Sequence, residues 1–152
     1  MSDTTIGKII GIALRTAVNG QMREVNEAQA VEKGGLVGDV KSSEARGVTF
    51  LSSKQWEQVQ SELGTPLPWH TRRANVLVEA GSLAHLIGKT IELGQVQIEI
   101  KAETRPCELM DTLHQGLRRA LTPDLRAGVY GKIIRAGQFR VGDVVRVTNP
   151  HQ

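Results

Sequence analysis

The chain has 152 residues, 39% of them apolar and 23% charged, which is the length and composition of one globular domain. Its formal net charge of +3 is too small an excess to indicate nucleic-acid binding by itself. A single cysteine excludes an internal disulfide, and no apolar run reaches the roughly 18 residues of a membrane span. The N-terminus lacks the basic-then-apolar layout of a signal peptide. We therefore expect one cytoplasmic domain over residues 1–152, with no membrane partner.

Short apolar segments that alternate with glycine turns predict strands in the first half of the chain. The candidate strands are residues 6–14, 22–31 and 47–51. Ser52 and Gln55 then fit a capping box, in which each side chain bonds the backbone of the other residue. Apolar residues follow at helical spacing until Gly64, a typical C-terminal stop. This pattern predicts a helix over residues 53–63.

The second half is also rich in strand signals. Candidate strands are residues 75–78, 90–93, 95–102, 129–135, 138–141 and 144–147, and short helices are expected at 82–86, 106–113 and 116–121. Turns at Gly137 and at Gly142-Asp143 predict that the last three strands form a meander. Seven or so short strands with two or three short helices favour a mainly β protein with a partly closed β-barrel.

Cys107 stands where a predicted strand ends and a short helix begins. Pro106 is typical of the first turn of a helix, so free backbone N–H groups are expected around the thiol. These dipoles and the neighbouring Arg105 favour the thiolate. A thiolate attacks sulfur, carries a persulfide or binds a soft metal such as molybdenum. A second interpretation is that Cys107 is a small buried apolar residue.

An ordered set of short motifs surrounds this cysteine between about residues 35 and 147. They are Gly-Asp at 38–39, an Arg-opened strand at 46–51, Arg-Ala-Asn at 73–75, Pro-Cys at 106–107, Arg-Ala-Gly-Val at 126–129 and Gly-Asp at 142–143. In this order the motifs resemble the MOSC family, whose members include the C-terminal module of molybdenum-cofactor sulfurases. The resemblance implies a single MOSC-type β-barrel domain with an arginine-lined pocket that Cys107 faces.

The resemblance also implies a function. Cys107 would carry sulfur as a persulfide, in association with the molybdenum cofactor. The residues implied to bind that cofactor are Arg46, Arg73, Asn75, Arg105 and Arg126. Because the sulfurases' pyridoxal-phosphate domain is not part of this sequence, no pyridoxal phosphate is expected here. The sulfur is expected from a donor such as a cysteine desulfurase.

Two other functions stay open. Related MOSC proteins bind the cofactor itself, with the cysteine as molybdenum ligand, and reduce N-hydroxylated compounds. Here that role would need a separate electron-transfer partner, and residues 40–45 lack the histidine found in many members, which favours the carrier. The tail at 137–147 also resembles barrels of translation factors, which makes an RNA-binding barrel the other alternative. The scarcity of aromatic residues argues against it. As an enzyme, the chain would be a sulfur transferase or part of a molybdenum-dependent reductase.

Overall fold

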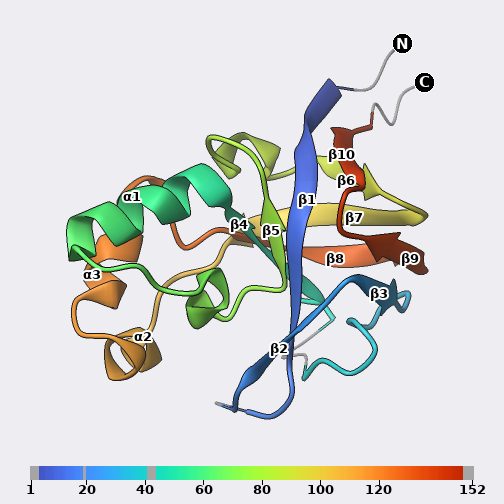
Figure 1. Ribbon diagram of the computed structural model, residues 1–152. Helices are drawn as coiled ribbons and strands as arrows, with labels where there is room; N and C mark the ends of the chain where they lie inside the picture. Colours follow the sequence, from blue (N-terminus) through green and yellow to red (C-terminus); the bar gives the residue numbers. More distant parts are fainter. Residues whose placement is uncertain (1–3, 19, 41–43, 149–152) are drawn as a thin grey trace.

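Seven strands close on one another to form a barrel, with the helices gathered on one side (Figure 1). The computed structural model describes residues 4–18, 20–40 and 44–148. The barrel runs in the order β10-β6-β7-β8-β4-β5-β1, and a further pairing of β10 with β1 closes it. The barrel strands are β1 (Thr4–Arg15), β4 (Val48–Ser52), β5 (Val76–Val78), β6 (Thr90–Leu93), β7 (Val96–Glu103), β8 (Val129–Arg135) and β10 (Val144–Val147). The predicted β-barrel is confirmed, and its closure is complete instead of partial.

The long strand β1 changes partners along its length. Thr4 to Lys8 pair with β10, Ile9 to Ile12 pair with β5, and Ile12 to Arg15 pair with β2 (Met22–Val25). The strand thus closes the barrel with its first part and extends beyond it with its last part. Arg15, the final residue of β1, is carried in this way to the mouth of the functional site described below.

Strands β4 and β5 lie parallel, and the helix α1 (Ser53–Leu63) makes the crossover between them. Every residue of both strands is buried. Both faces of this parallel strand pair are buried, because the crossover helix packs on one face and the barrel core on the other. This explains why residues 48–52 and 76–78 are nearly continuous apolar runs instead of alternating ones. Helix α1 has the predicted bounds.

Only half of the predicted capping box forms at the start of α1. The Ser52 hydroxyl accepts a hydrogen bond from the backbone N–H of Gln55 at 3.2 Å, as expected. The Gln55 side chain, however, does not return to Ser52. It donates to the carbonyl of Asp124 at 2.8 Å and so joins α1 to the segment before β8. Gly64 ends the helix in the left-handed region, with φ 71°.

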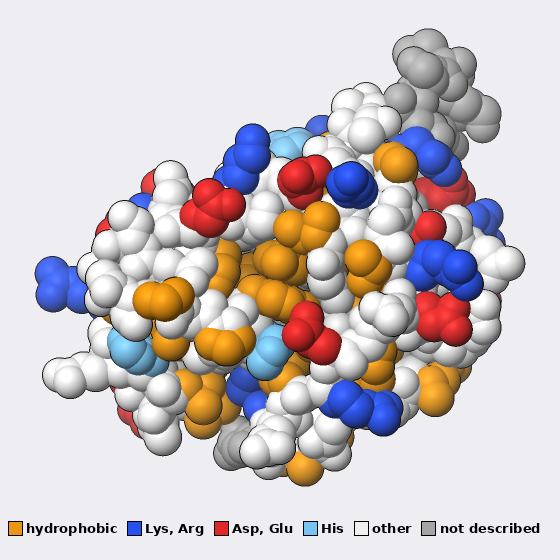
Figure 2. Space-filling view, in the orientation of Figure 1, with side chains coloured by type: hydrophobic (Ala, Val, Ile, Leu, Met, Phe, Trp, Pro, Cys, Tyr) orange, Lys and Arg blue, Asp and Glu red, His pale blue; other side chains and the backbone are white. Residues whose placement is uncertain are grey.

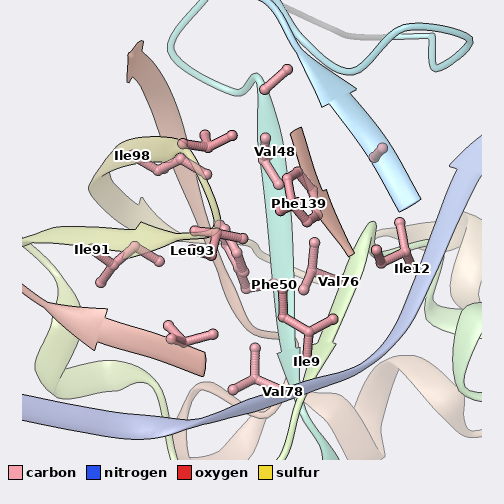
Figure 3. Close-up of a cluster of buried hydrophobic side chains, with 14 of the residues drawn as sticks. Ile9, Ile12, Val48, Phe50, Val76, Val78, Ile91, Leu93, Ile98 and Phe139 are labelled. Carbon is pink, nitrogen blue, oxygen red and sulfur yellow. The ribbon is translucent and has the colours of Figure 1, made fainter. Parts of the chain in front are cut away.

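Two apolar cores hold the fold together. The first fills the barrel, where side chains from opposite strands point toward one another, including Ile9, Phe50, Leu93 and Phe139 (Figure 3). The second lies between the barrel wall and the helices, around Trp56. Alternation along β4 and β5 divides their side chains between the two cores. The helices therefore pack against the outside of the barrel through the second core.

Two predictions about the strands are wrong. Residues 22–31 form two strands, β2 and β3 (Glu27–Ala30), which separate at Asn26. The last three strands are not a meander, because β9 (Gly137–Arg140) pairs with β3 in a separate two-stranded sheet and β10 pairs with β1 and β6. The turn at Gly142 and Asp143 bonds to Ile9 of β1 instead, through Gly142 N–H to Ile9 O at 2.8 Å and Ile9 N–H to Asp143 O at 2.9 Å.

The remaining helices are short. They are α2 (Glu108–Leu113), α3 (Leu117–Leu121) and the 3-10 turns η1 (Trp69–Arg72), η2 (Ala84–Leu86) and η3 (Pro123–Leu125). Pro106 is not in the first turn of α2 as predicted, because the helix begins after Cys107, which is itself the N-cap residue. Across the described ranges, none of the helices has the length and apolar character needed to cross a bilayer.

Candidate functional site

A cavity of about 330 Å³ opens where β1, β4, η1 and α2 meet. The segments around it are distant in sequence, and the barrel brings them together. Arginine is its most frequent residue, and no acidic side chain of the described part of the chain lines it. The lining residues are Arg15, Ala17, Val18, Val40, Arg46, Thr49, Arg72, Arg73, Arg105, Cys107, Leu109 and Met110. The cavity thus combines one thiol with five guanidinium groups.

Cys107 is exposed, and its thiol is free. It lies between the end of β7 and the start of α2, in an extended conformation with φ −119° and ψ −179°. Its carbonyl accepts the first bond of α2, from Met110 N–H at 3.0 Å. The side chain makes no capping hydrogen bond and is left for other chemistry. The interpretation of Cys107 as a buried apolar residue is therefore wrong.

A buried polar network fixes one side of the cavity. Asp39, whose side chain is fully buried, binds Arg15 through Nε to Oδ1 at 3.2 Å and Nη2 to Oδ2 at 3.0 Å. Asn75 donates from Nδ2 to Asp39 Oδ1 at 3.2 Å and to Ala13 O at 3.1 Å. Its Oδ1 accepts from the backbone N–H and the hydroxyl of Thr49, at 3.1 and 3.2 Å. The network ties β1, β4 and β5 together behind the lining.

Arg72 is a buried cation that forms no ion pair with a carboxylate of the described residues. It donates from Nε to Ala127 O at 3.0 Å, and its Nη1 lies 3.8 Å from Met110 Sδ. Burial is the main cause that lowers the pKa of Arg72 to about 10, the nearby charges of Arg46 and Arg15 act in the same direction, and Cys107 acts in the opposite direction. Because that pKa is still well above neutrality, Arg72 remains charged at pH 7.

Arg46, like Arg72, forms no ion pair with a carboxylate of the described residues. Its guanidinium lies 4.9 Å from the centre of the Tyr130 ring, an arrangement that favours a cation–π contact. Its Nε atom is buried and has no hydrogen-bond partner in the described part of the chain. Arg46 also lines a second hollow, next to the first, which it shares with Arg105. A buried N–H without a partner favours an added acceptor beside it.

The remaining arginines of the lining are Arg73 and Arg105. Arg73 has a left-handed backbone with φ 68°, and its guanidinium donates to the carbonyls of Gly20 and Ala17 in the turn after β1. Burial, together with the neighbouring Arg15, lowers the pKa of Arg73. Arg105 is largely exposed at the rim, with Nε 3.7 Å from the carboxylate of Glu103.

Four of the six predicted site residues line the cavity, namely Cys107, Arg46, Arg73 and Arg105. Asn75 does not line the cavity, and its side chain instead forms hydrogen bonds with Asp39 and Thr49. Arg126 lies elsewhere, because its Nη1 binds Glu62 at 2.8 Å and the carbonyl of Ala120 at 3.1 Å. This cavity therefore does not include Arg126.

Three residues of the site were not predicted from the sequence, namely Arg15, Arg72 and Asp39. The Gly-Asp motif at 38–39 forms a turn, in which the N–H of Asp39 donates to Leu36 O at 3.0 Å. Nothing in the sequence around Asp39 indicates that its carboxylate is buried. Arg72 directly precedes a predicted site residue, which is a signal that could have found it. Clusters of three or more His, Cys, Asp or Glu residues that could hold a metal are not present in the described ranges.

Charged side chains of both signs border an apolar hollow at the centre of the face in Figure 2. Among the described residues visible there, the basic side chains are scattered between acidic ones and do not form a continuous band. A protein that follows a phosphate backbone usually presents a basic stripe. This face therefore gives the RNA-binding alternative no support.

Comparison with known proteins places the fold. Among solved structures, the YuaD protein from Bacillus subtilis aligns with a TM-score of 0.81 at 18% identity, over 96% of this chain and 97% of that one. YiiM from Escherichia coli gives 0.72 at 12% identity, over 93% and 70%. YiiM from Geobacillus stearothermophilus gives 0.70 at 12%, over 97% and 76%. At these identities the likeness establishes a shared fold.

No curated protein matches the sequence. The family model described as the MOSC domain matches residues 37–146, which include most of the barrel and Cys107. The match begins after Arg15, so β1 contributes to the site from outside the matched segment. Since the match covers more than half of the chain and the solved structures share the same barrel, this protein belongs to the MOSC domain family.

Proposed function

We propose that the protein is a molybdenum-cofactor-associated sulfur carrier that holds sulfur as a persulfide on Cys107. The observation that carries the proposal is the exposed thiol on the wall of a cavity that five arginines line. A persulfide that has lost its proton is an anion, and nearby guanidinium groups stabilise it. The family as a whole is associated with the molybdenum cofactor.

The loading step needs only a sulfur donor and the thiolate of Cys107. The thiolate attacks the outer sulfur of a donor persulfide, R–S–SH, and a new S–S bond forms on Sγ. The S–S bond of the donor breaks, and the donor leaves as the thiolate R–S⁻ with that electron pair. The proton stays on the transferred sulfur, so no oxidant or reductant is consumed. The reverse exchange passes the sulfur to an acceptor thiolate. A cysteine desulfurase is a donor of the required kind.

The lining also fits the molybdenum cofactor itself. Arg46 and Arg72 form no ion pair with a carboxylate of the described residues, and guanidinium groups suit the bidentate binding of a phosphate. The thiol of Cys107 is a soft ligand of the kind that molybdenum accepts. When bound, the cofactor would supply two-electron redox chemistry. The second candidate function is therefore a molybdenum-dependent reductase subunit that acts on N-hydroxylated compounds with an electron-transfer partner.

Intact mass and metal content separate the two functions. The protein and a Cys107→Ser variant would be purified from cells that make molybdenum cofactor. The carrier function predicts a gain of about 32 Da, one sulfur atom, that dithiothreitol removes and the variant lacks. Stoichiometric molybdenum in the protein and not in the variant would instead support the reductase. If neither is found, or if the variant carries the same adduct, the proposal fails.

A further inference from the structure

The arginines that line the cavity differ in whether a carboxylate neutralises their charge. Arg15 is neutralised by Asp39 at 3.0 Å, and Arg105 lies 3.7 Å from Glu103. Arg46, Arg72 and Arg73 have no such carboxylate among the described residues, and the guanidinium of Arg73 is turned to the carbonyls of Gly20 and Ala17. The lining therefore carries at least two positive charges that the described part of the chain leaves without an anion.

Arg46 and Arg72 differ from ordinary surface arginines because the fold holds them in place. Arg72 is 9% exposed and is fixed by Ala127 O on one side and Met110 Sδ on the other. Met110 belongs to the first turn of α2, the helix whose N-cap is Cys107. Arg46 is fixed by its contact with the Tyr130 ring. Desolvated and prepositioned guanidinium groups bind a compact oxyanion more strongly than mobile ones do.

We propose that this site takes sulfur directly from a small dianion with a sulfonate head and a transferable outer sulfur, of which thiosulfate is the simplest example. The inference rests on the proposed persulfide function, and it names a donor class that needs no protein partner. The sulfonate oxygens bind Arg46 and Arg72, which directs the outer sulfur toward Cys107. The cavity, at about 330 Å³, has room for such an ion together with water.

The transfer step is balanced without an added oxidant or reductant. The Cys107 thiolate attacks the outer sulfur of thiosulfate, S–SO₃²⁻, and forms the S–S bond of the persulfide anion Cys–S–S⁻. The S–S bond of thiosulfate breaks, and its electron pair leaves with sulfite, SO₃²⁻. Three negative charges are present before the step and three after it. Cyanide can then remove the outer sulfur as thiocyanate, which regenerates the thiolate and allows turnover to be followed.

The test compares two donors on the full chain. Reduced protein is incubated with thiosulfate or with ethyl hydropersulfide, which has no oxyanion, and intact mass gives the rate at which one sulfur is added. The variants are Arg46→Gln, Arg46→Lys, Cys107→Ser and, as a matched control, Arg119→Gln. Arg119 is exposed on α3 and does not line the cavity. Melting temperatures confirm that each variant is folded.

Loading by thiosulfate is expected for the wild type and for Arg119→Gln, and not for Cys107→Ser. The rate at which thiosulfate loads Arg46→Gln should be lower than that of the wild type by about tenfold or more, because one charge-assisted hydrogen bond is lost. Arg46→Lys should recover part of that rate. With ethyl hydropersulfide, which has no oxyanion to bind, Arg46→Gln should slow loading by a smaller factor than with thiosulfate, and Arg119→Gln should not slow it. Thiosulfate that does not load the wild type, or that loads Arg46→Gln at the full rate, overturns the inference. If ethyl hydropersulfide also fails on the wild type, the proposed persulfide function falls with it.

Discussion

Arg15 and Asp39 are joined by three hydrogen bonds at the edge of the cavity. The backbone N–H of Arg15 donates to Asp39 Oδ1 at 2.7 Å, and its guanidinium donates to both carboxylate oxygens at 3.2 and 3.0 Å. The Asp39 side chain is fully buried, and that of Arg15 is 16% exposed. When one partner of a buried ion pair with this geometry is removed, the other charge is left buried without a counter-charge, which destabilises the fold. The pair holds the C-terminal end of β1 against the loop that contains Asp39.

Replacing Asp39 by asparagine should destabilise the protein. The shape is kept, but the partly buried Arg15 cation loses its counter-charge, and removal of one partner of such a pair costs about 3–5 kcal/mol. We expect the free energy of unfolding in urea to fall by about 3 kcal/mol.

The matched control for this prediction is Glu99→Gln. Glu99 forms an exposed ion pair with Lys101 at 3.3 Å, and such surface pairs contribute about 0–1 kcal/mol. If the asparagine variant at position 39 loses no more stability than this control, the Arg15–Asp39 pair does not have the structural role described here.

The local elements were predictable from the sequence because their signals are local. The bounds of α1 follow from Ser52, Gly64 and the apolar spacing between them. Strand pairing was less predictable, because it depends on contacts between distant segments. The ion pair of Arg140 with Glu27, which joins β9 to β3, spans 113 residues. A turn signal at Gly142 predicts a reversal of the chain, but not which strands lie on either side of it.

The site was predictable to the extent that family motifs mark it. Cys107, Arg46, Arg73 and Arg105 lie in or beside those motifs and line the cavity. Arg15 was missed because it lies before the motifs and reaches the site only through the partner changes of β1. The isolated sequence also cannot show which arginines have carboxylate partners, and it is the partners that distinguish Arg72 from Arg126.

Replacing Arg72 by methionine should cost little stability. The pKa of Arg72, about 10 in the folded protein, is below its usual value, so burial of the charge opposes folding below about pH 10. That cost is relieved as the pH rises from about 10 toward the unfolded value. Methionine removes it at neutral pH, and Ala127 O keeps its bond from the Thr104 hydroxyl at 2.6 Å.

We therefore expect the unfolding free energy of Arg72→Met at pH 7 to be unchanged or raised by about 1–3 kcal/mol. Arg72→Lys is the control, since it keeps a buried charge in a poorer geometry and should be the less stable of the two. Urea unfolding measures both. A loss of more than about 2 kcal/mol in the methionine variant would mean that Arg72 is a structural residue and not one held for an anion.

Sulfate should stabilise the protein through the same cations. It has the oxygens of a sulfonate and no transferable sulfur, so it binds without reacting. At ten times its dissociation constant, a ligand of the folded state adds about 1.4 kcal/mol, which raises the melting temperature of a domain of this size by about 3–6 °C.

Sodium chloride at equal ionic strength controls for screening of the other charges. Arg46→Gln and Arg72→Met should each reduce the sulfate-specific shift, and Arg119→Gln should leave it unchanged. Thermal unfolding followed by circular dichroism measures all of these shifts. An equal shift in chloride, or an undiminished one in both cavity variants, would show that sulfate acts elsewhere on the surface.

Persulfide formation on Cys107 can be measured by the intact mass of the reduced protein and of Cys107→Ser after exposure to ethyl hydropersulfide. We expect a gain of about 32 Da in the wild type that dithiothreitol reverses, with no gain in the variant. An unmodified wild type, or an equal gain in Cys107→Ser, would contradict the assignment of Cys107 as the sulfur carrier.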